Sequence, residues 1–272
     1  MAVPRRPRVC AGAYPRGLVI ALIGNLSRDF KPGRPPAVGG GPYHGARGLR
    51  RLRVPARIVA RCATADRQAL LPQLVRLGTP VRYVPGEATP TFGIAYDGDR
   101  REMLVEQLGD VWTPADIPPL PPIGWAHVAP LARHEFPAET IAALARRCRV
   151  SLDGQGLVRV PEVGPLRLDG NFDPEVLRYV WTLKLADEEA EVLGDPAALG
   201  VREVIVTHGS RGATLYTRGT RTDVPARAID VDPTGAGDAF MAAYIVARDA
   251  GFTAVGATRR ATAVVAAVLA GG

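Results

Sequence analysis

The sequence predicts an α/β fold in which helices cover both faces of a mainly parallel sheet. Two observations support this prediction. Short continuous apolar runs, typical of strands buried on both faces, recur along the chain, and helical patterns lie between them. Alternating strands and helices form right-handed βαβ units, which bring the strands into one parallel sheet. The apolar runs cover residues 18–23, 57–60, 81–84, 125–129, 150–152, 182–185 and 204–206.

Helix start signals follow several of these runs. The first backbone N–H groups of a helix have no partner within the helix. An acidic residue at the start can accept a hydrogen bond from one of them, and a proline has no N–H group there to satisfy. The sequence therefore predicts three helices with defined starts and two more from periodicity alone. Asp66 is expected to cap residues 68–77, Pro137 to open 138–148, and Asp173 with Pro174 to start 175–180; the amphipathic patterns cover 240–247 and 253–270.

One segment departs from this alternation. Residues 91–96 and 101–107 read as extended runs, and Asp97, Gly98 and Asp99 between them are typical of a hairpin turn. A hairpin inside an α/β chain is an insertion. From the residues alone it is either a lid over a site or an addition at the edge of the sheet.

Size and composition favour one enzyme-sized globular domain. The chain has 272 residues, of which 47% are hydrophobic, which is enough to bury a large core. Its net charge of +7 raises the question of nucleic acid, but Lys31 and Lys184 are its only lysines and the arginines are scattered. Because no basic stripe interleaved with aromatic residues occurs, we expect no nucleic-acid partner.

The cysteines and the apolar segments indicate the cellular compartment in which the protein is expected. Cys10, Cys62 and Cys148 fit no metal-binding or redox spacing, which favours free thiols in a reducing compartment. Residues 1–17 lack the apolar segment of a secretory signal and are expected to form a flexible leader. No apolar stretch is suited to cross a bilayer. We therefore expect a cytoplasmic protein with no membrane partner.

The most informative stretch is Val-Asp-Pro-Thr-Gly-Ala-Gly-Asp-Ala-Phe at residues 231–240. It predicts a loop that runs into a helix, where small residues at Gly235, Ala236 and Gly237 let backbone N–H groups approach an anion. Asp238 falls in the first turn, where the helix dipole favours its ionised form and keeps it available as a base. The alternative is an ordinary glycine-rich turn with an acidic residue.

This stretch resembles the C-terminal signature of the ribokinase-like (PfkB) carbohydrate kinases, and the resemblance extends from about residue 19 to the end of the chain. It implies a three-layer fold with a small β lid, ATP as phosphoryl donor and Mg²⁺ as cofactor. The backbone of residues 235–237 matches the family's anion hole, and Asp238 matches the base that activates the substrate hydroxyl. Asp232 and Thr234 match positions on the nucleotide side.

Two N-terminal motifs are similar to the family's substrate pocket. Residues 24–29 follow the first strand, and the resemblance implies that Asn25 and Asp29 bind substrate hydroxyls. Gly39 and Gly40 resemble the family's di-glycine signature. His44 stands where the family usually has asparagine, and an imidazole presents its one donor and one acceptor in a different geometry. Each of these polar residues could instead have a structural role.

Two further motifs are similar to the family's nucleotide and metal positions. Thr207, Gly209 and Gly212 resemble a turn beside the nucleotide. Glu189 matches a carboxylate that positions Mg²⁺ through water, although Ala186 replaces the asparagine of that motif. The alternative at residues 186–189 is a solvated acidic helix start that Asp187 caps.

The resemblance also defines the expected organisation and substrate. Residues 18–272 form a single kinase domain, the segments near 25–38 and 89–108 form the lid, and a homodimer forms through the lid. The substrate class is a sugar, a polyol or a nucleoside, and residues 153–159 are similar to the myo-inositol kinase branch. A P-loop is excluded because its motif does not occur. The competing hypothesis is a ligand-binding module on a kinase scaffold that has lost catalysis.

Overall fold

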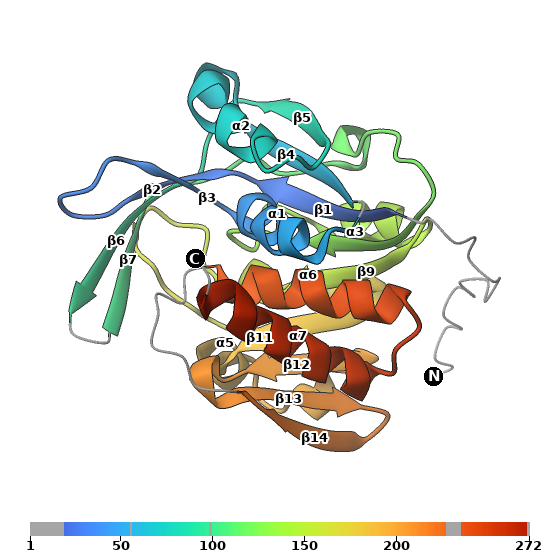
Figure 1. Ribbon diagram of the computed structural model, residues 1–272. Helices are drawn as coiled ribbons and strands as arrows, with labels where there is room; N and C mark the ends of the chain where they lie inside the picture. Colours follow the sequence, from blue (N-terminus) through green and yellow to red (C-terminus); the bar gives the residue numbers. More distant parts are fainter. Residues whose placement is uncertain (1–18, 55, 98–99, 227–234, 271–272) are drawn as a thin grey trace.

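The computed structural model describes residues 19–54, 56–97, 100–226 and 235–270 (Figure 1). Its centre is a nine-stranded sheet in the order β14-β13-β12-β11-β9-β8-β1-β4-β5. All pairs from β5 to β12 are parallel, whereas β13 and β14 pair antiparallel at one edge. The strands are β1 (Val19–Asn25), β4 (Ala56–Ala63), β5 (Val81–Gly86), β8 (Ile123–Val128), β9 (Arg149–Asp153), β11 (Thr182–Ala186), β12 (Glu203–Thr207), β13 (Gly212–Thr217) and β14 (Thr220–Pro225).

Helices pack on both faces of this sheet, so the predicted α/β class with three layers is confirmed. One buried cluster joins the sheet to α1, α2, α6 and α7, and a second joins its other face to α3, α4 and the short helix at Pro174–Tyr179. In Figure 1, α1, α6 and α7 lie in front of the sheet. The helices are α1 (Gly41–Leu52), α2 (Arg67–Val75), α3 (Ala138–Ala145), α4 (Gln155–Val158), α5 (Asp187–Leu193), α6 (Ala236–Asp249) and α7 (Ala254–Ala270).

A second sheet of five strands projects from one end of the large sheet, in the order β10-β7-β6-β2-β3 (Figure 1). The predicted hairpin is confirmed as its β6 and β7 pair. Phe92, Ile94 and Val105 of this sheet are buried against Leu131, which lies in a loop after β8. The strands are β2 (Ser27–Phe30), β3 (Ala37–Gly39), β6 (Thr91–Asp97), β7 (Arg100–Gln107) and β10 (Gly164–Pro165).

Several details differ from the sequence-based expectations. The segment expected as a helix over 175–180 is the 3-10 helix η3 (Pro174–Tyr179), although Asp173 does cap it by accepting from the Glu175 backbone N–H at 2.9 Å. Asp66 makes no capping bond and instead pairs with Arg28 of β2. The short strands β10, β13 and β14 were not predicted, because two to six residues with few apolar side chains give too little periodicity to read. The strands β2 and β3 lie in the segment near 25–38 that the family resemblance assigned to the β lid. The leader expected at residues 1–17 lies outside the described residues.

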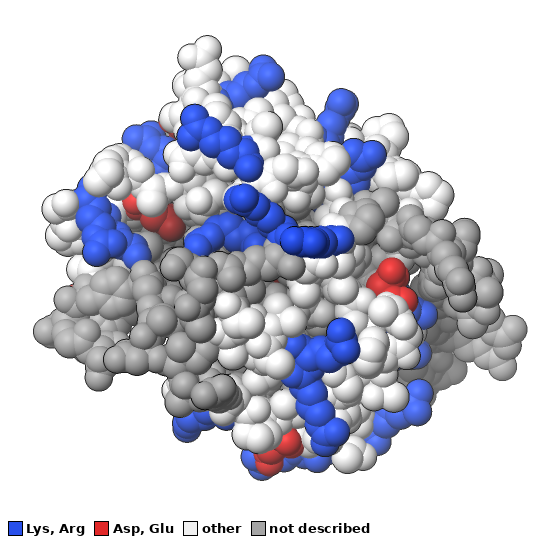
Figure 2. Space-filling model, viewed as in Figure 1, with Lys and Arg blue, Asp and Glu red and all other residues white. Residues whose placement is uncertain are grey.

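The surface bears out the scattered distribution of positive charge. Figure 2 shows lysine and arginine spread over this face of the molecule, with one group across the middle where α1 lies in Figure 1. The group is consistent with α1 because its Arg47 and Arg50 are exposed. Among the described residues, no helix has the length and apolar content that a bilayer crossing requires.

Candidate active site

Charged side chains from four elements converge near the carboxyl ends of the parallel strands. Such ends, at the edge of an open α/β sheet, are where these folds bind ligands. Asp153 ends β9, Lys184 lies in β11, and Glu189 lies in the first turn of α5. Asp238 enters from the first turn of α6. The small sheet begins at the same end of the large one, because β2 directly follows the carboxyl end of β1.

The start of α6 depends on glycine. Gly235 is the N-cap residue and has a φ of 81°, in the left-handed region that side chains other than glycine adopt at a cost. A Cβ at this position would also lie 2.5 Å from Nδ1 of His44, so the imidazole packs directly on the turn. Backbone N–H groups at the start of a helix have no partner within the helix and attract anions. Gly235, Ala236 and Gly237 therefore form a cradle suited to phosphate.

The carboxylate of Asp238 lies at this helix start without a hydrogen-bond partner for Oδ1 among the described residues. Burial and the neighbouring carboxylate of Asp153 raise its pKa to about 7, although the cations Lys184 and Arg159 act in the opposite direction. A base whose pKa is close to neutral can accept a proton and give it up again at physiological pH. The geometry therefore suits Asp238 to general base catalysis.

Close packing of α1 confines Asp238. A Cβ on Gly41, the first residue of α1, would lie 2.1 Å from Cβ of Ala129 and 2.9 Å from Oδ1 of Asp238. Gly41 thus allows two helix N-termini, those of α1 and α6, to meet at one carboxylate. Gly41 directly follows the predicted di-glycine signature of Gly39 and Gly40, and it lies against the expected base.

His127 is a further member of the site that the sequence analysis missed. It lies in β8, is fully buried, and its Nδ1 is 3.1 Å from the hydroxyl of Ser151. Burial lowers its pKa to about 4, so the imidazole is neutral. One ligand atom each from His127, Asp153 and Asp238 lie within 4.8 Å of one another, a spacing that could hold a metal ion. Nothing in the sequence near His127 marks it, because only the topology brings it to Asp238.

Lys184 lies in the same cluster and carries a permanent positive charge. Its Nζ is 3.4 Å from Oδ2 of Asp153 and 3.9 Å from Oε2 of Glu189. Glu189 is fixed in turn, because the same oxygen accepts from the Ala186 backbone N–H at 2.8 Å. In the sequence Lys184 stands out only as one of two lysines, because a position inside a buried strand gives no signal of such a role.

The residues expected to bind substrate separate into two groups. Asp29 and Gly39 lie together on the paired strands β2 and β3, where Ser27 donates to Oδ1 of Asp29 at 2.8 Å. Asn25 is fully buried, and its Oδ1 accepts from Nε1 of Trp112 at 2.9 Å. This placement favours a structural role for the Asn25 side chain.

Gly40 and His44 belong to the start of α1 rather than to the small sheet. Gly40 is the N-cap residue of α1 and has a φ of 91°. A Cβ at Gly40 would lie 2.3 Å from the Asn25 carbonyl oxygen, so this position also requires glycine. Since the His44 ring packs on Gly235, the structure brings His44 to the phosphate cradle.

The described residues expected on the nucleotide side lie at the end of β12 and in the turn that follows it. Thr207 donates its hydroxyl to the Leu185 carbonyl at 3.1 Å, and Gly209 and Gly212 both have positive φ values in the turn that follows. Asp187 contacts His208 and Arg211 of this turn, so it is not the cap of α5 that was considered. Asp232 and Thr234 lie outside the described residues.

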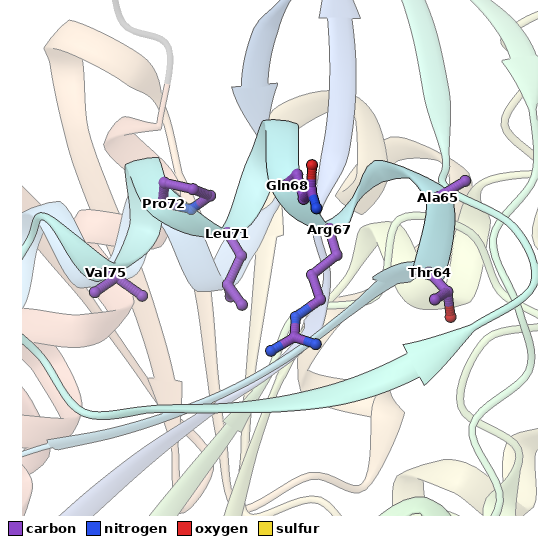
Figure 3. A pocket seen from close by; sticks show the side chains of 7 residues that line it. All are labelled: Thr64, Ala65, Arg67, Gln68, Leu71, Pro72 and Val75. Atoms are coloured by element: carbon purple, nitrogen blue, oxygen red, sulfur yellow. The ribbon is translucent and has the colours of Figure 1, made fainter.

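A cleft of about 980 Å³ lies beside the small sheet. Its lining includes residues of β6 and β7 together with Arg159, Glu188 and Glu189, whereas Asp153, Lys184 and Asp238 do not line it. A second hollow of about 880 Å³ lies elsewhere, along one exposed side of α2, where Arg67, Leu71 and Val75 point the same way (Figure 3). It contains none of the predicted site residues.

Comparison with known proteins supports this interpretation of the motifs. Residues 170–271 match the pfkB family carbohydrate kinase model. Inositol 3-kinase of Zea mays is 31% identical over 188 residues, which cover 67% of this chain and 48% of the relative. The chain therefore spans about half the length of this curated relative.

Solved structures match over almost the whole chain. A pyrophosphate-dependent kinase of the ribokinase family, in a sulfate complex, has a TM-score of 0.81 and 27% identity over 93% of this chain and 95% of its own. A pyrophosphate-dependent kinase of the same family, bound to a pyrophosphate analogue and myo-inositol, has a TM-score of 0.80 and 26% identity over 92% of this chain and 95% of its own.

Proposed function

The chain belongs to the ribokinase-like (PfkB) family, and we propose on this premise that it transfers a phosphoryl group to a hydroxyl of a small polyol. The observation that carries the proposal is the position of Asp238, a carboxylate with a pKa of about 7 at the glycine-lined start of α6. A base and an anion cradle on adjacent residues are what phosphoryl transfer to an alcohol requires.

We propose an inositol-like polyol as the acceptor, in preference to other sugars or a nucleoside. The relative in Zea mays is named an inositol 3-kinase, and one similar solved structure is complexed with myo-inositol. The motif at residues 153–159 supports the same choice, because it is similar to the myo-inositol kinase branch. It also contributes Asp153 and Arg159 to the cluster around Asp238. Asp29, with Gly39 beside it, is our candidate for binding acceptor hydroxyls.

The donor is a phosphoanhydride whose terminal phosphate lies at residues 235–237. ATP with Mg²⁺ is the expected donor, and Thr207, Gly209, Gly212, Asp232 and Thr234 are the proposed nucleotide contacts. The two similar structures described above are of pyrophosphate-dependent kinases, which makes pyrophosphate the alternative. Glu189 fits a role in holding Mg²⁺ through water, because its carboxylate lines the cleft, and Mg²⁺ would neutralise charge on the donor.

In the proposed mechanism the acceptor hydroxyl lies between Asp238 and the terminal phosphate. Asp238 accepts the hydroxyl proton while the acceptor oxygen forms a bond to phosphorus. The bond between that phosphorus and the bridging oxygen breaks, and ADP or inorganic phosphate leaves with the electron pair. Backbone N–H groups of residues 235–237 bind the oxygens of the group in transfer. The small sheet acts as a lid that limits the access of water.

The test is a transfer assay with ATP or pyrophosphate, Mg²⁺, and a panel of inositols, sugars and nucleosides. We expect phosphorylated inositol from the wild type and a loss of at least about 1,000-fold in kcat for Asp238→Asn. Equal turnover by both proteins would remove Asp238 from the mechanism. Binding of a polyol without transfer from either donor would favour the ligand-binding module instead.

For assembly and compartment, our proposals remain a homodimer through the lid and a cytoplasmic location. Sedimentation velocity of the wild type and of a variant without residues 91–107 tests the first. A dimer that persists after this deletion would exclude the lid as the interface.

A further inference from the structure

Lys184 is a cation beside the proposed reaction centre, because its Nζ lies next to Gly237 at the start of α6. Only 7% of the residue is exposed, and its partners Asp153 and Glu189 are 3% and 5% exposed. A charged amine so deep in a protein costs considerable free energy unless its partners compensate it. Two carboxylates at 3.4 and 3.9 Å provide that compensation.

The charge of Lys184 is constant over the working range of pH. Burial opposes the protonated form, but the carboxylates of Asp153, Glu189 and Asp238 together outweigh it and raise the pKa of the amine above its ordinary value. Lys184 is therefore neither a general base nor a proton shuttle. Its chemical capacity is that of a fixed positive charge with three N–H donors.

The amine reaches the phosphate cradle. A Cβ on Gly237 would lie 3.2 Å from Nζ and 3.3 Å from Cε of Lys184. The end of the lysine side chain thus packs on the backbone of the residue before Asp238, with no side chain between them. An anion held by the amides of residues 235–237 would come within reach of the same ammonium group.

These contacts leave the ammonium group positioned for one more anion. Asp153 and Glu189 approach Nζ at distances longer than a strong charged hydrogen bond of about 2.7–2.9 Å. A phosphate oxygen could therefore take a shorter contact without breaking the pair with Asp153. The carboxylates fix the side chain, and its charge is available to a ligand.

We propose that Lys184 is a catalytic residue that contacts the terminal phosphoryl group of the donor beside Gly237. The assignment rests on the proposed kinase function and deepens it. During transfer, negative charge on the phosphoryl oxygens is balanced by the ammonium group as well as by the amides of residues 235–237. Lys184 stays protonated throughout, so the proton of the acceptor still goes to Asp238. The contact is with the phosphate end, so it serves ATP and pyrophosphate alike.

The competing explanation is that Lys184 only neutralises Asp153 and Glu189. Both explanations predict that Lys184→Met lowers stability, because it leaves two buried carboxylates without their cation. The double variant Asp153→Asn/Lys184→Met removes one charge of each sign and restores the balance. Comparing it with Asp153→Asn alone isolates the contribution of the ammonium group.

The kinetic experiment measures kcat and KM with ATP and with pyrophosphate for these variants and for Lys184→Arg. We expect the double variant to have a kcat at least about 100-fold below that of Asp153→Asn, with the KM of the acceptor unchanged within about threefold. Lys184→Arg keeps the charge and should recover part of the rate. Equal kcat for the double variant and Asp153→Asn would overturn the proposal.

The matched control is Arg248→Met, which breaks a buried ion pair with Glu203 outside the site. It should lose stability but keep its kcat.

A binding experiment separates this proposal from the kinase function itself. Calorimetry with pyrophosphate and no acceptor should give a Kd at least about tenfold weaker for the double variant than for Asp153→Asn. Equal affinities would overturn the contact even in a protein without transfer activity.

Discussion

At the scale of single residues, the site is a balance of buried and half-buried charges. Three carboxylates, from Asp153, Glu189 and Asp238, share the cations Lys184 and Arg159. Burial and the excess of negative charge raise the pKa of Asp238 to about 7. The charge balance thus prepares one carboxylate, rather than all three, to exchange a proton near neutral pH.

This balance predicts the pH dependence of the reaction. Asp238 must be ionised to accept a proton, so kcat/KM should rise tenfold per pH unit below about pH 7 and level off above it. Initial rates from pH 5 to 9 at saturating donor would measure this. A profile that is flat from pH 5 to 8 would contradict the assignment of Asp238 as base.

The same shift predicts a stability change. Since the pKa of Asp238 rises from 3.8 to about 7 on folding, ionising this carboxyl lowers stability progressively between those pH values. Asp238→Asn removes that cost and should raise the free energy of unfolding by about 2 kcal/mol at pH 8. The gain should disappear below about pH 4, and denaturant unfolding at both pH values would test this. A variant less stable than the wild type at pH 8 would count against it.

A second buried cluster contributes to stability without a role in the site. Glu203 accepts from Thr182 at 2.9 Å and Tyr244 at 2.7 Å and pairs with Arg248 at 2.6 Å. Glu203→Ala should lower the free energy of unfolding by about 3–5 kcal/mol while the folded fraction keeps its kcat. The exposed pair of Glu162 and Arg167 is the matched control, since Glu162→Ala should change stability by less than about 1 kcal/mol.

At the scale of elements, the sequence predicted those helices and strands whose pattern lies within one short stretch of the chain. The parallel strands were predicted from apolar runs, and the start of α6 from its glycines. His127 and Lys184 could not be predicted as site residues, because they lie in strands that meet α6 only through the order β11-β9-β8. For Asn25 the motif predicted a substrate contact, and the structure adds what the motif does not show, a buried hydrogen bond from Trp112 to its Oδ1.

The start of α6 is the element on which the proposed chemistry depends most. Gly235→Ala combines a backbone penalty at a φ of 81° with a clash against His44. Gly251→Ala is the control, because Gly251 has a φ of 89° and a Cβ there would meet no atom within 4 Å. We expect Gly251→Ala to lower the free energy of unfolding by about 1 kcal/mol. Gly235→Ala should lower it by about 2 kcal/mol more than Gly251→Ala does, and denaturant unfolding measures both.

The two variants should also differ in activity. Gly235→Ala should lose transfer activity because the amides of the cradle move, and adding His44→Ala should recover stability by removing the clash. Equal stability and activity for the two alanine variants would show that the turn is not specifically constrained.

At the scale of the whole molecule, the fold joins a large α/β body to a small sheet. The chain passes directly from β1 into β2, and one apolar cluster of Phe92, Ile94, Val105 and Leu131 links the small sheet to the body. The lid role was expected from the family resemblance, and the hairpin itself from its turn residues. The parallel pairing of β2 with β6 was not predictable, because it joins segments about sixty residues apart.

The apolar link predicts how the lid affects side reactions. Phe92→Ala should loosen the small sheet, because it removes the largest side chain of the cluster. Water would then compete with the acceptor, so donor hydrolysis relative to transfer should rise about tenfold. Val75→Ala on exposed α2 is the control. An unchanged ratio for Phe92→Ala would argue against a closing lid.

The central claim is that Asp238 and residues 235–237 act on the acceptor and the donor at one point. A crystal structure with myo-inositol and an inert donor analogue measures this directly. We expect one acceptor hydroxyl within about 3 Å of the Asp238 carboxylate and terminal phosphate oxygens at the amides of residues 235–237. A complex in which the phosphate binds elsewhere, or in which Asp238 contacts no acceptor hydroxyl, would contradict it.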